Sequence, residues 1–319
     1  MPYLAPLRPI RLLACAALAA GLSPAWSCSA SESGGALGSV SSLRIKDGAA
    51  VTGSGAFSFT CGAVVLSALA GTPSLRATLQ PSVSGLTLKS GANAIPYQIY
   101  SAPGQNGPYT GGLLVVNLSG TTLLGLLNGA GAQVPVYIAT TPGANIPAGT
   151  YTDNLQLTWT YQNICEGLVN IAGLCLGTLN NGTAVRTVGI TLTVSNDCTI
   201  TAPNIVFGSA PLISGFGTVS DKLSLVCTKG MVYTVGLSAG GDPQGGRRRM
   251  ASGANRLAYD IFKPDNTVWG SVGTARAAGP GAADGTSVQQ LPYTATIYPN
   301  QSTPPAGSYS DSIVVDVSF

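Results

Sequence analysis

The sequence contains one domain written twice. Residues 90–100 (SGANAIPYQIY) return as residues 252–262 (SGANRLAYDIF), and residues 147–161 (PAGTYTDNLQLTWTY) return as residues 305–319 (PAGSYSDSIVVDVSF). The two offsets, 252 minus 90 and 305 minus 147, are 162 and 158 residues. Because both are close to the usual size of a domain, we predict two tandem domains of related fold.

The start of the chain is typical of a secretory signal peptide. Basic Arg8 and Arg11 precede an apolar stretch at 12–22, and a small-x-small pattern follows at 25–27. We therefore expect residues 1–27 to be removed and the mature chain to be exported with Cys28 as its first residue. Acylation of Cys28, as in a lipoprotein, is the alternative.

The cysteines obey the same repeat. Of the seven cysteines, Cys15 is lost with the signal peptide, and an even number in an exported chain favours disulfides. Each copy has one cysteine at its start and one near the end of its second strand, and the two cysteines without counterparts must close a local loop. The predicted pairs are Cys28 with Cys61, Cys198 with Cys227, and Cys165 with Cys175.

The pattern within each copy is that of half-buried strands. Leu155, Leu157 and Trp159 alternate with polar residues, as Ile313, Val315 and Val317 do in the second copy. Short alternating runs separated by Gly, Pro and Asn turns, with no amphipathic helix of useful length, predict an all-β chain. The expected architecture is two tandem immunoglobulin-like β-sandwiches.

The second copy lacks a strand that the first copy has. Residues 188–194 alternate apolar and polar and form the predicted last strand of a complete first domain, 28–195. The second domain, 196–319, has no such segment after Phe319, which matches Tyr161. Four missing apolar side chains are worth roughly 6 to 12 kcal/mol, which is comparable to the stability of a whole domain. We therefore expect a strand from another molecule to add to this domain. The predicted groove for it is formed by Ile313, Val315, Val317 and Phe319.

A subunit that polymerises by strand addition also needs a donor segment ahead of its first domain, and cleavage before Cys28 leaves none. The expectation is a subunit that accepts a strand but gives none, and that therefore ends a fibre.

The composition argues against catalysis. The chain has no histidine, and Glu32 and Glu166 are its only glutamates, which removes the commonest general base and the Ser-His and Cys-His nucleophile pairs. We expect no enzyme, cofactor or metal site. A net charge of +3 does not indicate nucleic acid binding, and the basic cluster at 247–249 is interpreted as a solvated turn.

These motifs resemble the spore coat protein U domain family, specifically the two-domain tip adhesins of archaic, Csu-type chaperone-usher pili. The motifs are Cys198 with Phe207-Gly208, Cys227-Thr228 before Tyr233, Arg249-Met250, 257–259, Trp269-Gly270 and 305–315. The resemblance is good over 198–319 and looser over 28–194. It implies a periplasmic chaperone that lends the missing strand, an outer-membrane usher that exports the complex, and an adjacent pilin subunit that replaces the chaperone.

Three apolar segments are expected as loops at the pole of the first domain opposite the linker: 63–70, 122–127 and 164–176. The matching loops of the second copy, 228–230 and 275–285, are polar or truncated. Clustered exposed apolar loops mark a binding surface, and the resemblance points to hydrophobic fingers that grip abiotic surfaces. The alternative is that the segments are extra strands or core plugs. The candidate surface residues are Val64, Val65, Leu66, Leu69, Leu123, Leu124, Leu126, Leu127, Ile164, Leu168, Val169, Ile171, Leu174 and Leu176.

The predicted function is attachment and biofilm formation by a tip adhesin that contacts an abiotic or host surface. One alternative is a minor structural pilin or coat protein without adhesive duty. Another is a lectin-like tip that binds a host glycan through Tyr97, Tyr100 or Tyr109.

Overall fold

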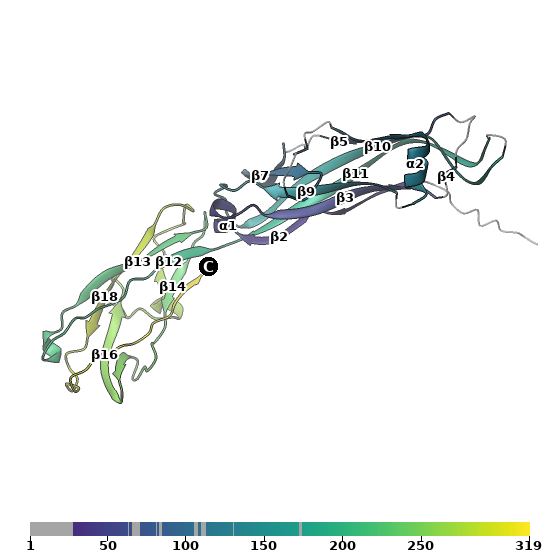
Figure 1. Ribbon diagram of the computed structural model, residues 1–319. Coiled ribbons are helices and arrows are strands. Elements are labelled where there is room, and N and C mark those ends of the chain that lie inside the picture. Colours follow the sequence, from purple (N-terminus) through teal and green to yellow (C-terminus); the bar gives the residue numbers. More distant parts are fainter. Residues whose placement is uncertain are drawn as a thin grey trace, which may run out of the picture.

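The computed structural model describes residues 28–62, 64–65, 71–80, 82, 85–104, 108–109, 113–129, 131–171 and 174–319. The expected signal peptide, 1–27, therefore lies outside the described residues. Two β-sandwiches lie end to end with a bend between them (Figure 1), which confirms the all-β immunoglobulin-like fold class. Among the helices of the described ranges, none has the length and apolar character needed to cross a membrane.

The first sandwich comprises the elements from β1 to β11. Its strands are β1 (Ser29–Gly34), β2 (Ala36–Ser41), β3 (Thr52–Thr60), β4 (Val64–Val65), β5 (Ser74–Leu79), β6 (Thr87–Ser90), β7 (Asn93–Tyr100), β8 (Leu114–Ser119), β9 (Ala132–Thr140), β10 (Gly149–Ile171) and β11 (Leu174–Ser195). Its helices are α1 (Ser42–Asp47) and α2 (Gly120–Leu127). Strand β7 joins the two layers, because its first half pairs with β6 and its second half with β9.

The core of the first sandwich forms where the apolar residues of both layers meet. Phe57, Phe59 and Trp159 are fully buried, and the rings of Phe59 and Trp159 lie 5.4 Å apart. The predicted last strand lies within β11, which pairs antiparallel with β10 and parallel with β2. Its alternating apolar residues, Val188, Ile190, Leu192 and Val194, are all buried.

The second sandwich repeats this plan with shorter elements. Its strands are β12 (Cys198–Thr201), β13 (Val219–Cys227), β14 (Thr234–Leu237), β15 (Arg248–Ser252), β16 (Asn255–Phe262), β17 (Ala277–Ala278), β18 (Gln289–Ile297) and β19 (Val315–Ser318), with 3-10 turns η1 (Ile213–Gly215) and η2 (Gly273–Ala275). One layer has the order β12-β13-β18-β16-β15 and the other β17-β14-β19.

The sequence repeat corresponds to repeated local structure. Residues 90–93 and 252–255 form the turns of the β6–β7 and β15–β16 hairpins, with Gly91 and Gly253 in the left-handed region at φ +57° and +59°. In each copy a tyrosine hydroxyl donates to the carbonyl of a proline four residues earlier: Tyr151 to Pro147 and Tyr309 to Pro305. This is the tyrosine corner found in immunoglobulin-like sandwiches.

The three disulfides have the predicted pairing. Cys28 is bonded to Cys61, Cys165 to Cys175 and Cys198 to Cys227. The first and last of these bonds occupy equivalent places, since each joins the first strand of a sandwich to the end of the strand beside it.

The two sandwiches meet through hydrogen bonds. The Thr228 hydroxyl accepts from the backbone N–H of Asp197 at 2.7 Å, and its Oγ1 lies 2.6 Å from the Ser42 hydroxyl at the start of α1. The Lys46 ammonium, also on α1, donates to the carbonyl of Gly285 at 2.7 Å. The polar loops of the second copy, 228–230 and 283–285, thus lie against the first sandwich.

Candidate functional site

The free end of the first sandwich is formed by β4, α2 and the distal part of the β10–β11 hairpin (Figure 1). These elements carry the three segments that were expected as exposed loops. Strand β4 pairs with β10 through Val64 and Val65, so the first and third segments are parts of one sheet.

Four of the candidate surface residues are buried, which corrects the prediction for them. Leu123 and Leu127 are one helical turn apart on α2, and residues at i and i+4 share one face, which here packs on the core. Val64 and Ile164 point into the same core from β4 and β10. These four side chains are core plugs, the alternative considered above, and cannot contact a surface.

The other ten candidates remain a prediction. Val65 and Leu126 are half-buried. Leu66 and Leu69 lie outside the described residues, and so do the side chains of Leu124, Leu168, Val169, Ile171, Leu174 and Leu176.

The disulfide at this end bends the β10–β11 hairpin. In the hairpin register Cys165 faces Leu179, whereas Cys175 faces Asn170. In a straight hairpin this stagger of about five residues would separate the cysteines by about 16 Å, but their Cα atoms are 5.8 Å apart. A register shift between Gly167 and Val169 accommodates the bend. The distal hairpin is therefore held back toward its base.

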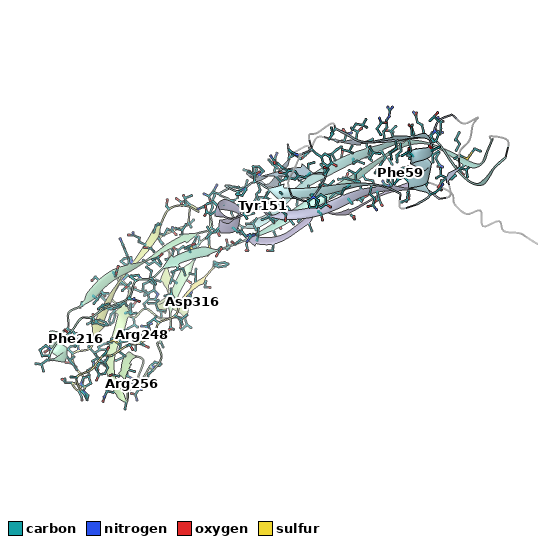
Figure 2. All side chains as sticks on the ribbon, viewed as in Figure 1. Phe59, Tyr151, Phe216, Arg248, Arg256 and Asp316 are labelled. Carbon is teal, nitrogen blue, oxygen red and sulfur yellow. A yellow bond between two sulfur atoms is a disulfide. The ribbon has the colours of Figure 1, made fainter. Side chains whose placement is uncertain are left out.

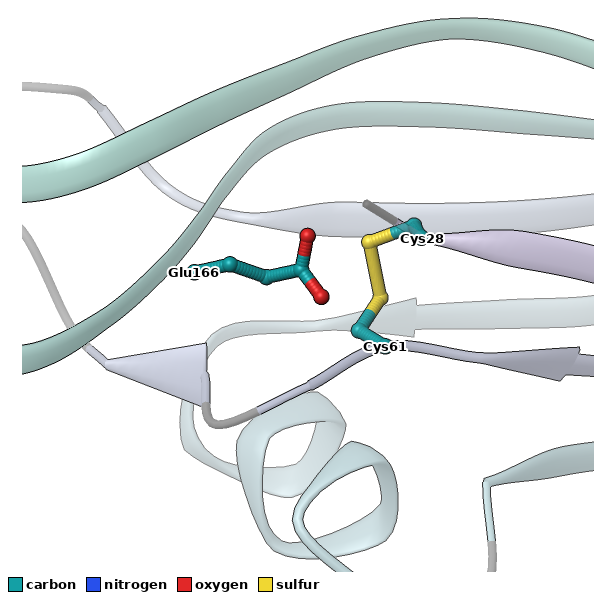
Figure 3. A group of neighbouring side chains, drawn as sticks. All are labelled: Cys28, Cys61 and Glu166. Atoms are coloured by element: carbon teal, nitrogen blue, oxygen red, sulfur yellow. A yellow bond between two sulfur atoms is a disulfide. The ribbon is translucent and has the colours of Figure 1, made fainter. Parts of the chain in front are cut away.

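A buried carboxylate fastens the base of this end (Figure 3). Glu166 accepts from the backbone N–H of Gly62, next to the disulfide of Cys28 and Cys61, and from Asn180 Nδ2 on β11 at 2.9 Å. Ligand-type atoms of Glu166 and both cysteines lie within 4.8 Å of one another. Because the two sulfurs are bonded to each other, no thiolate is available there for a metal ion.

Asn128 fastens the same end from the other side. Its Oδ1 accepts from the N–H of Val64 and its Nδ2 donates to the carbonyl of Val64, each at 2.7 Å. Asn128 follows α2 directly, so this pair of bonds ties the helix to β4. The three apolar segments therefore share one hydrogen-bonded base.

The second sandwich contains an apolar groove of about 390 Å³. One wall is formed by residues 202–207 and the other by residues 309–315. The floor consists of core side chains, including Leu223, Ile261 and Tyr293. In the first sandwich the equivalent place, between β10 and β2, is filled by β11.

Strand β19 explains why the groove is open. It pairs with β14 along one edge, as β10 pairs with β5, but in the described residues no strand pairs with its other edge. An exposed strand edge beside an apolar groove is a template for an added strand.

The predicted groove residues divide into three kinds. Ile313 and Val315 line the groove. Val317 is half-buried against the core and pairs with Val235. Phe319 is 68% exposed and lies at the junction, beside Pro147 of the first sandwich, because the strand has already left the groove by that point.

A repeated tyrosine and aspartate pair supports the groove. The Tyr259 hydroxyl donates to Asp311 at 2.9 Å, and the equivalent Tyr97 donates to Asp153 at 2.7 Å. Burial, together with the hydrogen bond to Asp311, raises the pKa of Tyr259 above its usual value, so the hydroxyl remains a donor. Tyr259 and Asp311 both line the groove, so the bond holds its wall in place.

The basic cluster is only in part the solvated turn expected from the sequence, since Arg247 is exposed but Arg248 is not. Arg248 is buried on β15, forms an ion pair with Asp260 at 3.1 Å, and donates to the carbonyls of Ser238, Leu237 and Trp269. These partners are 10 to 21 residues away in the chain, and no local pattern indicates them.

The tyrosines considered for glycan binding are mostly inaccessible. Tyr97 and Tyr100 are buried, and Tyr109 packs partly against the first core. Two of the three side chains therefore cannot stack on a sugar.

Comparisons with known proteins agree with this architecture. A family model described as the Spore Coat Protein U domain matches residues 14–158 and 184–316. The solved chaperone-tip adhesion subunit pre-assembly complex from the archaic chaperone-usher Csu pili of Acinetobacter baumannii is similar, with a TM-score of 0.57 and 25% identity over 92% of this chain and 100% of that chain. The CupB6 tip adhesin of Pseudomonas aeruginosa is more distant, with a TM-score of 0.36 and 12% identity over 92% and 93% of the two chains. No curated protein sequence matches the chain.

Proposed function

The chain belongs to the spore coat protein U domain family, and on that premise we propose that it is the tip adhesin subunit of a chaperone-usher pilus. Residues 28–195 are the adhesin domain and residues 196–319 the pilin domain that accepts a donor strand. The mature chain passes through the periplasm to the cell surface, where it mediates attachment and biofilm formation.

The groove of the second sandwich carries the proposal. The groove occupies the position in the second sandwich that β11 fills in the first. Among the described residues, no strand pairs with the edge of β19 that borders it. The similar structure from Acinetobacter baumannii is that of a tip adhesion subunit in complex with its chaperone. A periplasmic chaperone therefore fills the groove first, and a strand of the adjacent pilin subunit replaces it after transfer to the outer-membrane usher.

Adhesion is assigned to the free end of the first sandwich. Once the four buried residues are excluded, the distal β10–β11 hairpin carries half of the remaining apolar candidates, five of ten. The disulfide of Cys165 and Cys175 bends this hairpin, and a constrained loop loses less conformational entropy on binding. The contact with an abiotic or host surface is largely hydrophobic.

A triple variant tests the adhesive assignment. Leu168, Leu174 and Leu176 are replaced by Ser in cells that assemble the pilus, and attachment to polystyrene is measured. We expect normal fibres and a loss of most attachment. The matched control is Val185→Ser, because Val185 is 50% exposed on β11 but faces the middle of β10 in the hairpin register. Equal attachment by wild type and triple variant would reject the hairpin as the contact.

Immunogold labelling separates a tip adhesin from a structural pilin. Antibodies against the first sandwich are expected to mark one end of each fibre. Label distributed along the fibres would instead assign the chain to the shaft.

A further inference from the structure

The junction inside the chain shows how one sandwich follows another after a completing strand. Strand β11 runs antiparallel to β10 and leaves the first sandwich at Ser195. After a link of two residues, Asn196 and Asp197, the first strand of the second sandwich begins at Cys198. A completing strand and the next sandwich are therefore separated by a very short link, which forces the two sandwiches into contact.

The contact at this junction uses one defined pole of the second sandwich. The turn after β13 presents Thr228, which bonds to Asp197 and lies against Ser42 of α1. The loop at 283–285 receives Lys46 of the same helix. The pole of the second sandwich that contacts the first is therefore equivalent to the pole that carries the apolar segments in the first sandwich.

A strand added in the groove would leave at the other pole. Phe319 lies at the junction beside Pro147, while Ser310, at the start of the groove wall, pairs with Ala251 next to the hairpin turn at 253–254. An added strand antiparallel to β19, as β11 is to β10, therefore runs from the junction toward that turn. It leaves the second sandwich at the end farthest from the first.

That far end has exposed apolar residues where the first sandwich has a polar helix. In chain order η1 and its neighbours correspond to α1, since both lie just before the long strand that ends at a disulfide cysteine. Leu212 is 60% exposed, and Phe216 is half-buried. Figure 2 places Phe216, together with Arg256, at the end of the second sandwich away from the first.

We infer that Leu212 and Phe216 form a docking surface for the neighbouring pilin, in a contact that repeats the junction inside the chain. The partner is an immunoglobulin-like pilin sandwich whose own N-terminal strand fills the groove. It meets this surface with the turn that follows its cysteine-bearing second strand. At the junction inside the chain, α1 contacts polar partners through the Ser42 hydroxyl and the Lys46 ammonium. At the far end Leu212 and Phe216 stand in their place, so the turn of the partner pilin that contacts them is expected to be apolar. The inference rests on the proposed function, since it requires strand addition in trans.

Site-specific photocrosslinking on assembled fibres tests the inference. A benzoylphenylalanine replaces Leu212, Ile313 or Val272 in the full chain, in cells where this is the only copy, and the crosslinked products of purified fibres are identified by mass spectrometry. Ile313 lines the groove and reports strand addition. Val272 is 74% exposed beside η2 and serves as the matched surface control.

The expected result is that Leu212 and Ile313 capture the same pilin, Leu212 through the turn after the second cysteine and Ile313 through the N-terminal strand. Capture at Val272 should be several-fold weaker. If Ile313 captures the pilin while Leu212 captures nothing, or captures another part of it, the docking surface is wrong and strand addition stands. If Ile313 also captures no pilin, both the docking surface and the proposed function are wrong.

Discussion

Supplying the groove of the second sandwich with a strand in the same chain should stabilise that sandwich strongly. In the first sandwich the equivalent strand inserts Val188, Ile190, Leu192 and Val194, all buried. Burial of each such side chain is worth about 1.5 to 3 kcal/mol, so the strand contributes roughly 6 to 12 kcal/mol as an upper estimate. With a urea m-value of about 3 kcal/mol/M, the low end of that range corresponds to a rise of the unfolding midpoint by roughly 2 M.

The variant appends a Gly/Ser linker and a second copy of residues 188–194 after Phe319 of the mature chain. Trp159 and Trp269 are both fully buried, one in each sandwich, so Trp159→Phe leaves Trp269 fluorescence as the reporter of the second sandwich. The control extension has Ser at the four apolar positions. Equal midpoints for the apolar and the Ser extension would refute the idea that the second sandwich lacks a strand.

Three further substitutions test contacts within the sandwiches. Arg248→Met should destabilise the second sandwich by about 3 to 5 kcal/mol in urea unfolding, because Asp260 remains buried and unpaired. Adding Asp260→Leu should recover part of this loss. Strictly additive losses of the two substitutions would contradict a coupled pair. Glu166→Gln should cost the first sandwich about 1 to 3 kcal/mol, since an amide cannot accept both hydrogen bonds, and an unchanged melting temperature would count against this. Hydrogen bonds from two arginines lower the pKa of Asp242, so its contribution to stability is present above the unfolded value of 3.8 and is lost as pH falls through the folded pKa. The stability difference between wild type and Asp242→Asn should therefore shrink below that pH, and a constant difference down to pH 2 would exclude the charge as its cause.

The duplication made most of the fold predictable. Once 147–161 and 305–319 are aligned, the cysteine pairs and the equivalent turns of the two sandwiches follow from comparison of the copies. These features depend on chain order and on a period of two, both of which can be read without knowledge of distant contacts.

The apolar segments were harder to interpret, because an apolar run has the same composition in a loop, a strand or a buried helix. Residues 122–127 form part of α2, and Leu123 and Leu127 point inward. Their spacing of four residues is consistent with a helix, but a helix of 8 residues is too short to give a clear periodic signal.

Other features depend on partners far away in the chain. Arg248 is buried because Asp260 and three carbonyls surround it, and a run of three arginines gives no sign of this. The sequence of the polar loop at 228–230 gives no sign that the loop is covered, whereas β4, in its apolar counterpart, lies at the free end. Thr228 is buried against the first sandwich, where its hydroxyl contacts that of Ser42. This contact accounts for a polar residue at that position, and it is visible only in the folded chain.

The disulfide of Cys198 and Cys227 determines how the molecule responds to pulling. If the first sandwich is attached to a surface, as proposed above, tension reaches the second sandwich through Asn196 and Asp197 and enters β12 at Cys198. Since Cys198 is bonded to the end of β13, the force passes covalently to a central strand of the sheet, and β12 cannot be peeled away one hydrogen bond at a time. In the first sandwich the tension runs along β11 itself, which leads from the distal hairpin to Ser195. Rupture under flow is therefore directed to the one strand held without a covalent link, the one supplied by the neighbour.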